Sequence, residues 1–246
     1  MRMLFLAGVA ASLMSAAPLI AQDGGEGVAI EDPYLLFAQT MSPEEIYDLS
    51  FEATMVQLAA AYTNDSDIAA MEAECPGSVS AMVEGTRDLM RKAHREEGRV
   101  LLEAATRIAR SRFDEAEIRE ITSFFANPLG QKMLFNAAAN VEASQSFNDV
   151  VSNDDSSIGQ AAFEADRQSH VEKTVQAMSA DDIAELERFF AGKPWLVDLQ
   201  AFSSDMATEK LRIINLPLDP ADDAAIAERT EAALTAHLAT CEAVAP

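Results

Sequence analysis

Two cysteines and three histidines are the residues of this chain whose types best suit metal binding or nucleophilic chemistry. His94, His170 and His237 fall in three separate segments, and none of them lies in the HExxH or paired-histidine pattern of a zinc site. The GxSxG, P-loop, GxGxxG and CxxC motifs are absent from the sequence. We therefore expect no catalytic residue, no metal and no cofactor. The alternative is a hydrolase or metal-dependent enzyme whose site is assembled from distant segments.

The two cysteines favour a structural role. Cys75 lies in EAECPGS, at the end of a short helical segment, and Cys241 lies in HLATCEA near the C-terminus. Neither cysteine has the context of a thiol nucleophile, and in an oxidising compartment an even pair without metal-like spacing is typical of a disulfide. The sequence predicts a Cys75–Cys241 disulfide, and two buried free thiols are the alternative.

Three acidic pairs are better explained by helix starts than by chemistry. Asp154-Asp155, Asp181-Asp182 and Asp222-Asp223 each lie at or just before a predicted helix N-terminus. There, carboxylates accept backbone N–H bonds and offset the helix dipole. The segment from Asn153 to Glu164 matches part of a calcium loop, but isoleucine replaces the glycine of its sixth position. We expect no calcium there.

Basic residues are concentrated in one predicted helix. Eight of the 18 Lys and Arg residues fall between Thr86 and Arg112, a segment with four acids, within a chain of net charge −23. One interpretation is a docking face for an acidic ligand or partner. The other is a helix whose basic side chains pair with acidic neighbours of the same fold. The candidate residues for the docking face are Arg87, Arg91, Lys92, Arg95 and Arg99.

The stretch FFANPLGQKM, residues 124–133, predicts a tight corner between two helices. Phe124 and Phe125 close the first helix, and Asn127 and Pro128 suit the N-cap and first position of the next. Gly130 costs about 1 kcal/mol of helix propensity relative to alanine. We therefore expect Gly130 to allow a close approach between the new helix and the two aromatic rings.

The corner resembles the signature Phe-Tyr-x-Ser-Pro-x-Gly-x-Lys of an exported bacterial family, the domain of unknown function numbered 2059. The resemblance covers about residues 80–150, and the signature departs twice, because Phe125 replaces the tyrosine and Asn127 replaces the serine. Asparagine caps a helix as serine does, so the corner should be kept. The resemblance implies a helical periplasmic protein with no established activity.

The N-terminus, MRMLFLAGVAASLMSAAPLIAQ, has the order of a secretory signal peptide: one basic residue, an apolar run and small residues before a polar segment. We predict a signal peptide over residues 1–21, with cleavage between Ala21 and Gln22. An uncleaved anchor helix is the alternative. The mature protein should be periplasmic, with no stable membrane insertion, and residues 22–40 should form a flexible lead-in.

The rest of the chain predicts helices throughout, with no alternating run long enough for a strand. Ser42 to Glu45 reads as a capping box, Val79 to Arg110 as a long helix, and Pro128 to about Val151 as another. The helix after Ser42 has two apolar stripes, so we expect neighbours on both sides. The first stripe is Ile46, Leu49, Ala53, Val56 and Ala60; the second is Phe51, Met55, Leu58 and Tyr62.

An internal repeat organises these helices. IREITSFFAN (residues 118–127) aligns without a gap with IAELERFFAG (residues 183–192), and a proline follows each within two residues. The sequence predicts an all-α fold, a helical bundle or short α-solenoid built from two related helix-corner-helix units, with no sheet. The units span residues 41–152 and 158–246, and they could form one continuous domain. Trp195, the single tryptophan, should lie in the core.

The charge excludes one class of partner and the architecture favours another. A net charge of −23 repels nucleic acid, so we expect no nucleic-acid binding. A stack of helical repeats forms a concave surface, and no catalytic motif is present. We expect a non-enzymatic module that binds another envelope protein or peptide in a groove between the repeats.

Overall fold

The computed structural model describes residues 32–152 and 157–242. Every regular element in these two ranges is a helix, which confirms the predicted all-α class. The helices are α2 (Pro33–Thr40), α3 (Glu44–Tyr62), α4 (Ser66–Glu74), α5 (Ser78–Arg112), α6 (Glu115–Ala126), α7 (Pro128–Ala139), α8 (Ser144–Ser152), α9 (Gln160–Gln176), α10 (Ala180–Phe190), α11 (Leu196–Ile214) and α12 (Pro220–Glu242).

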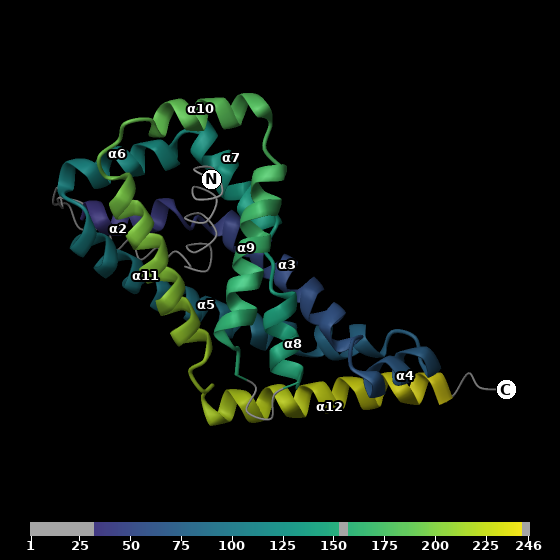
Figure 1. Cartoon of the computed structure of the whole chain (residues 1–246). Coiled ribbons are helices and arrows are strands. Elements are labelled where there is room, and N and C mark those ends of the chain that lie inside the picture. The colour runs from purple at the N-terminus through teal and green to yellow at the C-terminus, as the bar shows by residue number, and fades with distance from the viewer. Residues whose placement is uncertain (1–31, 153–156, 243–246) are drawn as a thin grey trace.

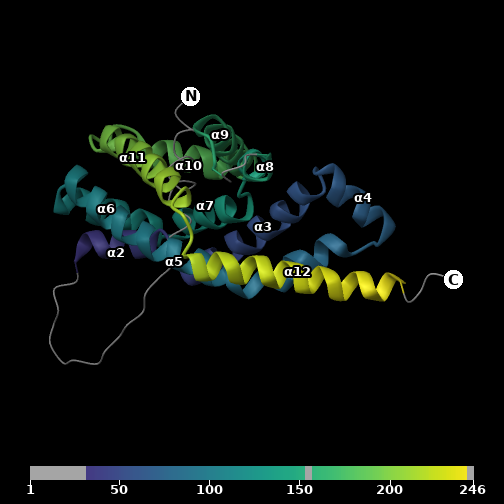
Figure 2. The same cartoon turned by 90° about the horizontal axis from the view of Figure 1, so that it is seen from below.

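The molecule has a broad body and a tapering arm (Figures 1 and 2). The body contains α2, α6, α7, α9, α10, α11 and the C-terminal half of α5. The arm contains α4, α12 and the N-terminal half of α5, and α3 extends from the body into it. Because α5 contacts α2 and α11 in the body and α12 in the arm, it connects the two parts, as α3 also does.

Two hydrophobic clusters stabilise these parts. The body cluster draws on both predicted units, and its largest side chains, all 2% exposed or less, include Phe37, Phe125, Trp195 and Phe202. The arm cluster joins α3 to the start of α5, with Leu234 of α12 packed against it. Its buried members are Phe51, Met55, Leu58, Val79, Met82 and Val83.

The prediction of a flexible lead-in over residues 22–40 is wrong for its last part. Pro33–Thr40 form α2, with Asp32 as N-cap and Pro33 in the first turn. Phe37 is fully buried, and its ring lies 5.5 Å from the ring of Phe202. The short apolar stretch after Pro33 becomes helical because the body provides a surface on which it can be buried.

The capping box predicted at Ser42 does not form. Pro43 takes the N-cap position of α3, no side chain makes a capping hydrogen bond there, and Glu44 and Glu45 occupy the first turn. The helix therefore begins with carboxylates near its positive end, which stabilise it through the helix dipole.

The helix predicted from Pro128 to Val151 is in fact two helices, α7 and α8. Side chains of two neighbouring helices, α3 and α9, bind the backbone at the break. The Gln57 side chain of α3 bonds the carbonyl of Val141 and the N–H of Ala143. The Asp166 carboxylate of α9 accepts the N–H groups of Gln145 and Ser146 at 2.9 and 2.7 Å, which caps α8.

The two copies of the internal repeat pack directly on each other. Phe124 of α6 stacks on Phe189 of α10 with ring centroids 4.4 Å apart, and it meets Phe190 edge-on at 5.0 Å. Trp195 is buried as predicted, and its Nε1 donates to Glu120 at 2.8 Å. The repeated aromatic pairs therefore fill the junction between the units as core.

Candidate functional site

The corner at residues 124–132 is structural in each of its parts. The side chain of Asn127 accepts the N–H of Gly130 at 2.9 Å, so it caps α7 as predicted. A Cβ on Gly130 would lie 2.3 Å from the carbonyl oxygen of Phe124 and 2.6 Å from the Cα of Phe125. The close approach is therefore to the backbone of α6, whereas the sequence predicted contact with the rings.

Lys132, the last residue of the motif, links the corner to the second unit. Its ammonium group lies 2.5 Å from the Asp182 carboxylate of α10. Asp182 also completes a capping box with Ser179. Hydrogen bonds from Lys132 and Ser179 lower the pKa of Asp182 to about 2. This ion pair connects the two repeats across the surface of the body.

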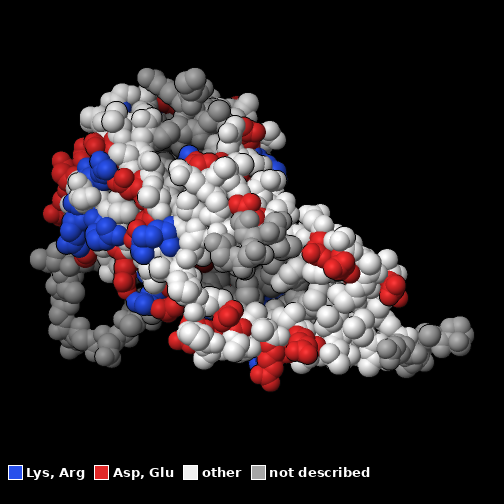
Figure 3. Space-filling model, turned by 60° about the horizontal axis from the view of Figure 1, so that its bottom comes forward, with Lys and Arg blue, Asp and Glu red and all other residues white. Residues whose placement is uncertain are grey.

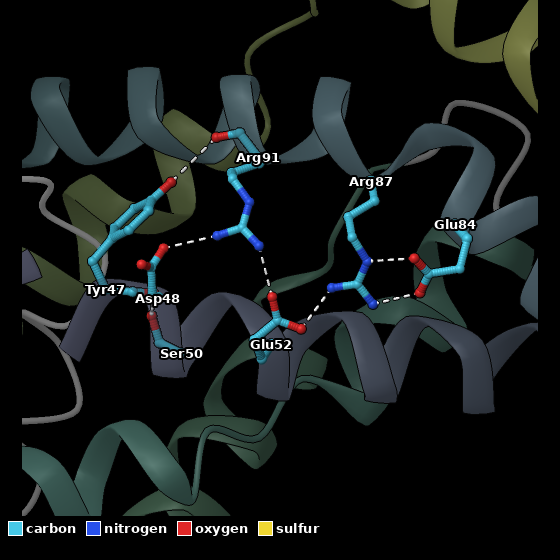
Figure 4. Close-up of polar contacts among 7 residues, drawn as sticks. All are labelled: Tyr47, Asp48, Ser50, Glu52, Glu84, Arg87 and Arg91. Carbon is cyan, nitrogen blue, oxygen red and sulfur yellow. Dashed lines mark hydrogen bonds and ion pairs between the residues drawn. The ribbon is translucent and has the colours of Figure 1, made fainter. Parts of the chain in front are cut away.

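The predicted docking face on α5 is largely occupied by acids of the same chain (Figure 4). Arg87 lies 2.5 Å from Glu52 and 2.6 Å from Glu84. Arg91 reaches both Asp48 and Glu52, at 2.8 and 2.7 Å. The hydrogen bond from Arg87, followed by that from Arg91, lowers the pKa of Glu52. The pairs join α5 to α3.

The remaining candidates of that face follow the same pattern, with one exception. Lys92 pairs with Asp222 of α12 at 2.8 Å. Arg99 pairs with Glu96 and Glu103 on its own helix, each at 2.6 Å. Arg95 is exposed and makes no ion pair within the described residues. An acidic ligand would have to displace intramolecular partners from four of the five residues, which weakens the docking interpretation.

His94 lies in an aromatic pocket between α3 and α5. Its ring stacks on Tyr47 at 4.5 Å and lies 5.6 Å from Phe51. Its Nδ1 is 3.8 Å from a carboxylate oxygen of Glu97, whereas its Nε2 is buried without a hydrogen-bond partner. Burial raises the pKa of the Tyr47 phenol. Because Nε2 has no partner, no described hydroxyl or thiol is positioned for activation by that nitrogen.

The other two histidines have separate surroundings. His170 of α9 is buried, its Nε2 lies 2.7 Å from the Ala137 carbonyl, and burial lowers its pKa to about 4. A neutral imidazole donates to that carbonyl and holds α9 against α7. His237 lies on α12 in the arm, with its Nε2 3.1 Å from the Pro76 carbonyl. The three rings thus have different partners on different helices.

The predicted Cys75–Cys241 disulfide is present, with 5.8 Å between the two Cα atoms. It connects the end of α4 to the last turns of α12 and so closes the tip of the arm. His237 lies beside this disulfide, and this proximity was not predicted from the sequence. The signal was available, because His237 and Cys241 are four residues apart and share one face of a helix.

One apolar surface is only partly covered by the described residues. Leu49 is 37% exposed and Val56 is 70% exposed, while Ala53 is half-buried and Ala60 exposed. Their spacing places all four on one face of α3, which we call the α3 stripe. The prediction that α3 has more than one neighbour is confirmed, because it contacts α5, α7 and α8, but beyond Ile46, which is fully buried, the stripe stays partly or largely exposed.

Several predictions concern residues outside the described ranges. The signal peptide, its cleavage site and the first part of the lead-in lie within residues 1–31, and Asp154-Asp155 and the start of the calcium-like segment lie within residues 153–156. No helix in the described part of the chain is both long and apolar enough to span a bilayer.

The chain matches no protein-family model, and comparisons with curated proteins and with solved structures likewise find no match. The resemblance of residues 124–132 to the exported family therefore remains a prediction.

Proposed function

We propose that the protein is a non-enzymatic binding module of the cell envelope that holds a helical segment of another protein against the α3 stripe. The observation that carries this proposal is the exposure of Leu49 and Val56 on one face of a helix whose opposite face is core. From Leu49 to Ala60 the stripe is about 16 Å long at 1.5 Å per residue. Three turns of apolar surface suit an amphipathic helix with apolar anchors at matching intervals.

Charge favours a basic partner. The chain carries a net charge of −23, and the acids of the arm outnumber its basic residues, which include Arg87, Arg91, Lys92 and Arg229. In Figure 3 the tapering end shows Asp and Glu, whereas the Lys and Arg of this face gather on the body. Such a field attracts a segment with Lys or Arg beside its apolar face and repels acidic chains. The acids of the arm are Asp65, Asp67, Glu72, Glu74, Glu84, Asp88, Asp222, Asp223, Glu228, Glu231 and Glu242.

Two observations of different kinds support the proposed compartment. The Cys75–Cys241 disulfide is of the type that forms and persists in oxidising compartments. The N-terminal sequence has the order of a signal peptide. Together they support export, with the periplasm as the site of action in a host with two membranes.

The test compares two valines of equal exposure. Val56 on α3 is 70% exposed and Val197 on α11 is 69% exposed. A photo-crosslinking residue at position 56, in cells, should yield a defined adduct whose partner peptide is an amphipathic helix with basic flanks. The same residue at position 197 should not yield it.

Val56→Lys should then abolish that adduct when the crosslinker is placed at the exposed position 60, and Val197→Lys should leave it unchanged. Both side chains are exposed, so neither substitution should change the free energy of unfolding by more than about 0.5 kcal/mol. Equal adducts from both positions, or a defined turnover by the purified protein that is lost in His94→Gln, would contradict the proposal.

A further inference from the structure

Three side chains with metal-binding atoms meet at the tip of the arm. His237 and Cys241 lie one turn apart on the same face of α12, and Cys75 follows the last residue of α4. The two sulfur atoms and a ring nitrogen of His237 all lie within 4.8 Å of one another. Cys75 is buried, whereas His237 and Cys241 are half-buried, so solvent reaches one side of the cluster.

The turn after α4 orients the imidazole of His237. Its Nε2 lies 3.1 Å from the Pro76 carbonyl, and a carbonyl can only accept, so a neutral ring donates there and carries no proton on Nδ1. A backbone carbonyl that fixes one ring nitrogen is the usual support for a metal-ligating histidine. Gly77 has φ +99°, and a Cβ there would lie 3.0 Å from His237 Cε1, so the turn leaves space for the ring.

A carboxylate fixes the same turn and adds negative charge beside it. Glu72 accepts the N–H groups of Gly77 and Val79 at 2.8 and 2.9 Å. These backbone hydrogen bonds lower the pKa of Glu72. The turn is therefore held by hydrogen bonds between α4 and the start of α5, as well as by the disulfide. The negative charge of Glu72 creates a local field that favours a cation.

We propose that the reduced protein binds one Zn²⁺ ion through Cys75, Cys241 and His237, with water in the fourth position. A dithiol transfers two electrons and two protons to the disulfide and forms a disulfide itself, which leaves two thiols on the protein. Zn²⁺ then displaces the two thiol protons. Two thiolates and an imidazole are ligands that zinc prefers. The disulfide and the zinc site are alternative states of the same three residues.

The backbone spacing suits both states. The Cα atoms of the two cysteines are 5.8 Å apart in the disulfide. In a tetrahedral site with Zn–S bonds of about 2.3 Å, the sulfurs lie about 3.8 Å apart. Side-chain rotation can supply that separation while α4 and α12 stay where they are.

The experiment uses the full mature protein, reduced with a water-soluble phosphine that becomes the phosphine oxide. Competition with a chelating dye should show one Zn²⁺ per chain, with a dissociation constant below about 1 μM, typical of a small thiolate site at neutral pH. The oxidised protein should bind none. Co²⁺ in place of Zn²⁺ should give the absorption of a tetrahedral thiolate site.

Two variants separate the three-ligand site from simple thiol binding. His237→Gln should weaken Zn²⁺ binding at least about tenfold, a loss within the range for altered metal sites. His94→Gln removes an imidazole from the contact between α3 and α5, outside the cluster of Cys75, His237 and Cys241, and should leave the affinity unchanged. Zn²⁺ should also raise the melting temperature of the reduced wild type but not of the oxidised protein. No binding by the reduced protein, or equal affinity in His237→Gln, would overturn the proposal.

Discussion

At the scale of single residues, Gly130 shows how a close backbone contact restricts a position to glycine. Any side chain there collides with the Phe124 carbonyl and the Phe125 Cα, neither of which can rotate away. Gly130→Ala should therefore lower the free energy of unfolding by about 1–3 kcal/mol, the range for overpacking. Helix propensity alone predicts a gain of about 1 kcal/mol.

A thermal or urea melt shows whether Gly130→Ala lowers or raises the free energy of unfolding. Ala227→Gly, at an exposed position of α12, calibrates the propensity effect in the same chain. If Gly130→Ala stabilises the protein while Ala227→Gly destabilises it, the packed corner is wrong.

The buried imidazole of His170 should make stability depend on pH. Burial lowers its folded-state pKa to about 4, below the ordinary value of 6.5, so the unfolded chain binds the proton more readily. Stability should be full above about pH 6.5 and fall as the pH drops toward 4, by an amount on the order of 3 kcal/mol.

Urea melts between pH 4 and pH 7 measure this slope. His170→Gln should flatten it in that window, whereas the loss at lower pH, where carboxylates such as Asp182 are protonated, should persist. An unchanged slope in the variant would show that His170 is not its source.

Sequence could identify residues whose partners are local and could not identify residues whose partners are distant. Asn127 caps the helix that follows it, so its role was predictable from its neighbours. Arg87 and Arg91 are paired with residues of α3, and nothing in the sequence states which acids they meet. The four-residue spacing of His237 and Cys241 is a local signal, whereas the approach of Cys75 to both is determined only by the fold.

At the scale of elements, α2 behaves as a part of the core. Its Phe37 is fully buried against Phe113 and Phe202, whereas Leu35 on the same helix is 37% exposed. Phe37→Ala should lower the free energy of unfolding by about 3–5 kcal/mol. Leu35→Ala, the matched control, should cost less than about 1 kcal/mol.

Chemical denaturation measures both variants. Similar small effects would mean that α2 is the loosely attached lead-in that its sequence predicts.

Some features of the helices could not be predicted from the sequence pattern. The existence and the type of most helices could be predicted from apolar periodicity, because an amphipathic face is formed by residues close together in the sequence. The break between α7 and α8 has no such signal. It depends on Gln57 and Asp166, which bind its backbone from α3 and α9, so only the tertiary structure determines it. The same is true of α2, whose helical state requires the surface of the body.

At the scale of the whole molecule, the Cys75–Cys241 disulfide should matter more to the arm than to the body. The bond spans 166 residues. The chain-entropy relation assigns such a loop about 5 kcal/mol, an upper figure. Because the body cluster contains neither cysteine, loss of the disulfide should destabilise α12 and α4 first.

Hydrogen exchange on the Cys75→Ser/Cys241→Ser double variant measures this. Amides of α12 should exchange faster, while amides of α6 and α10 should keep their protection. Uniform acceleration over all helices would show instead that the arm and the body unfold as one unit. Non-reducing digestion and mass spectrometry of the exported protein should recover the Cys75–Cys241 peptide pair.

The same bond imposes an order of events on biosynthesis. A ribosome makes the chain from its N-terminus, so 166 residue steps separate the appearance of Cys75 from that of Cys241. At 5–20 residues per second that interval is about 8–33 s. During it Cys75 has no second cysteine of its own chain with which to pair. The disulfide that closes the tip of the arm can therefore form only after nearly the whole chain has been made.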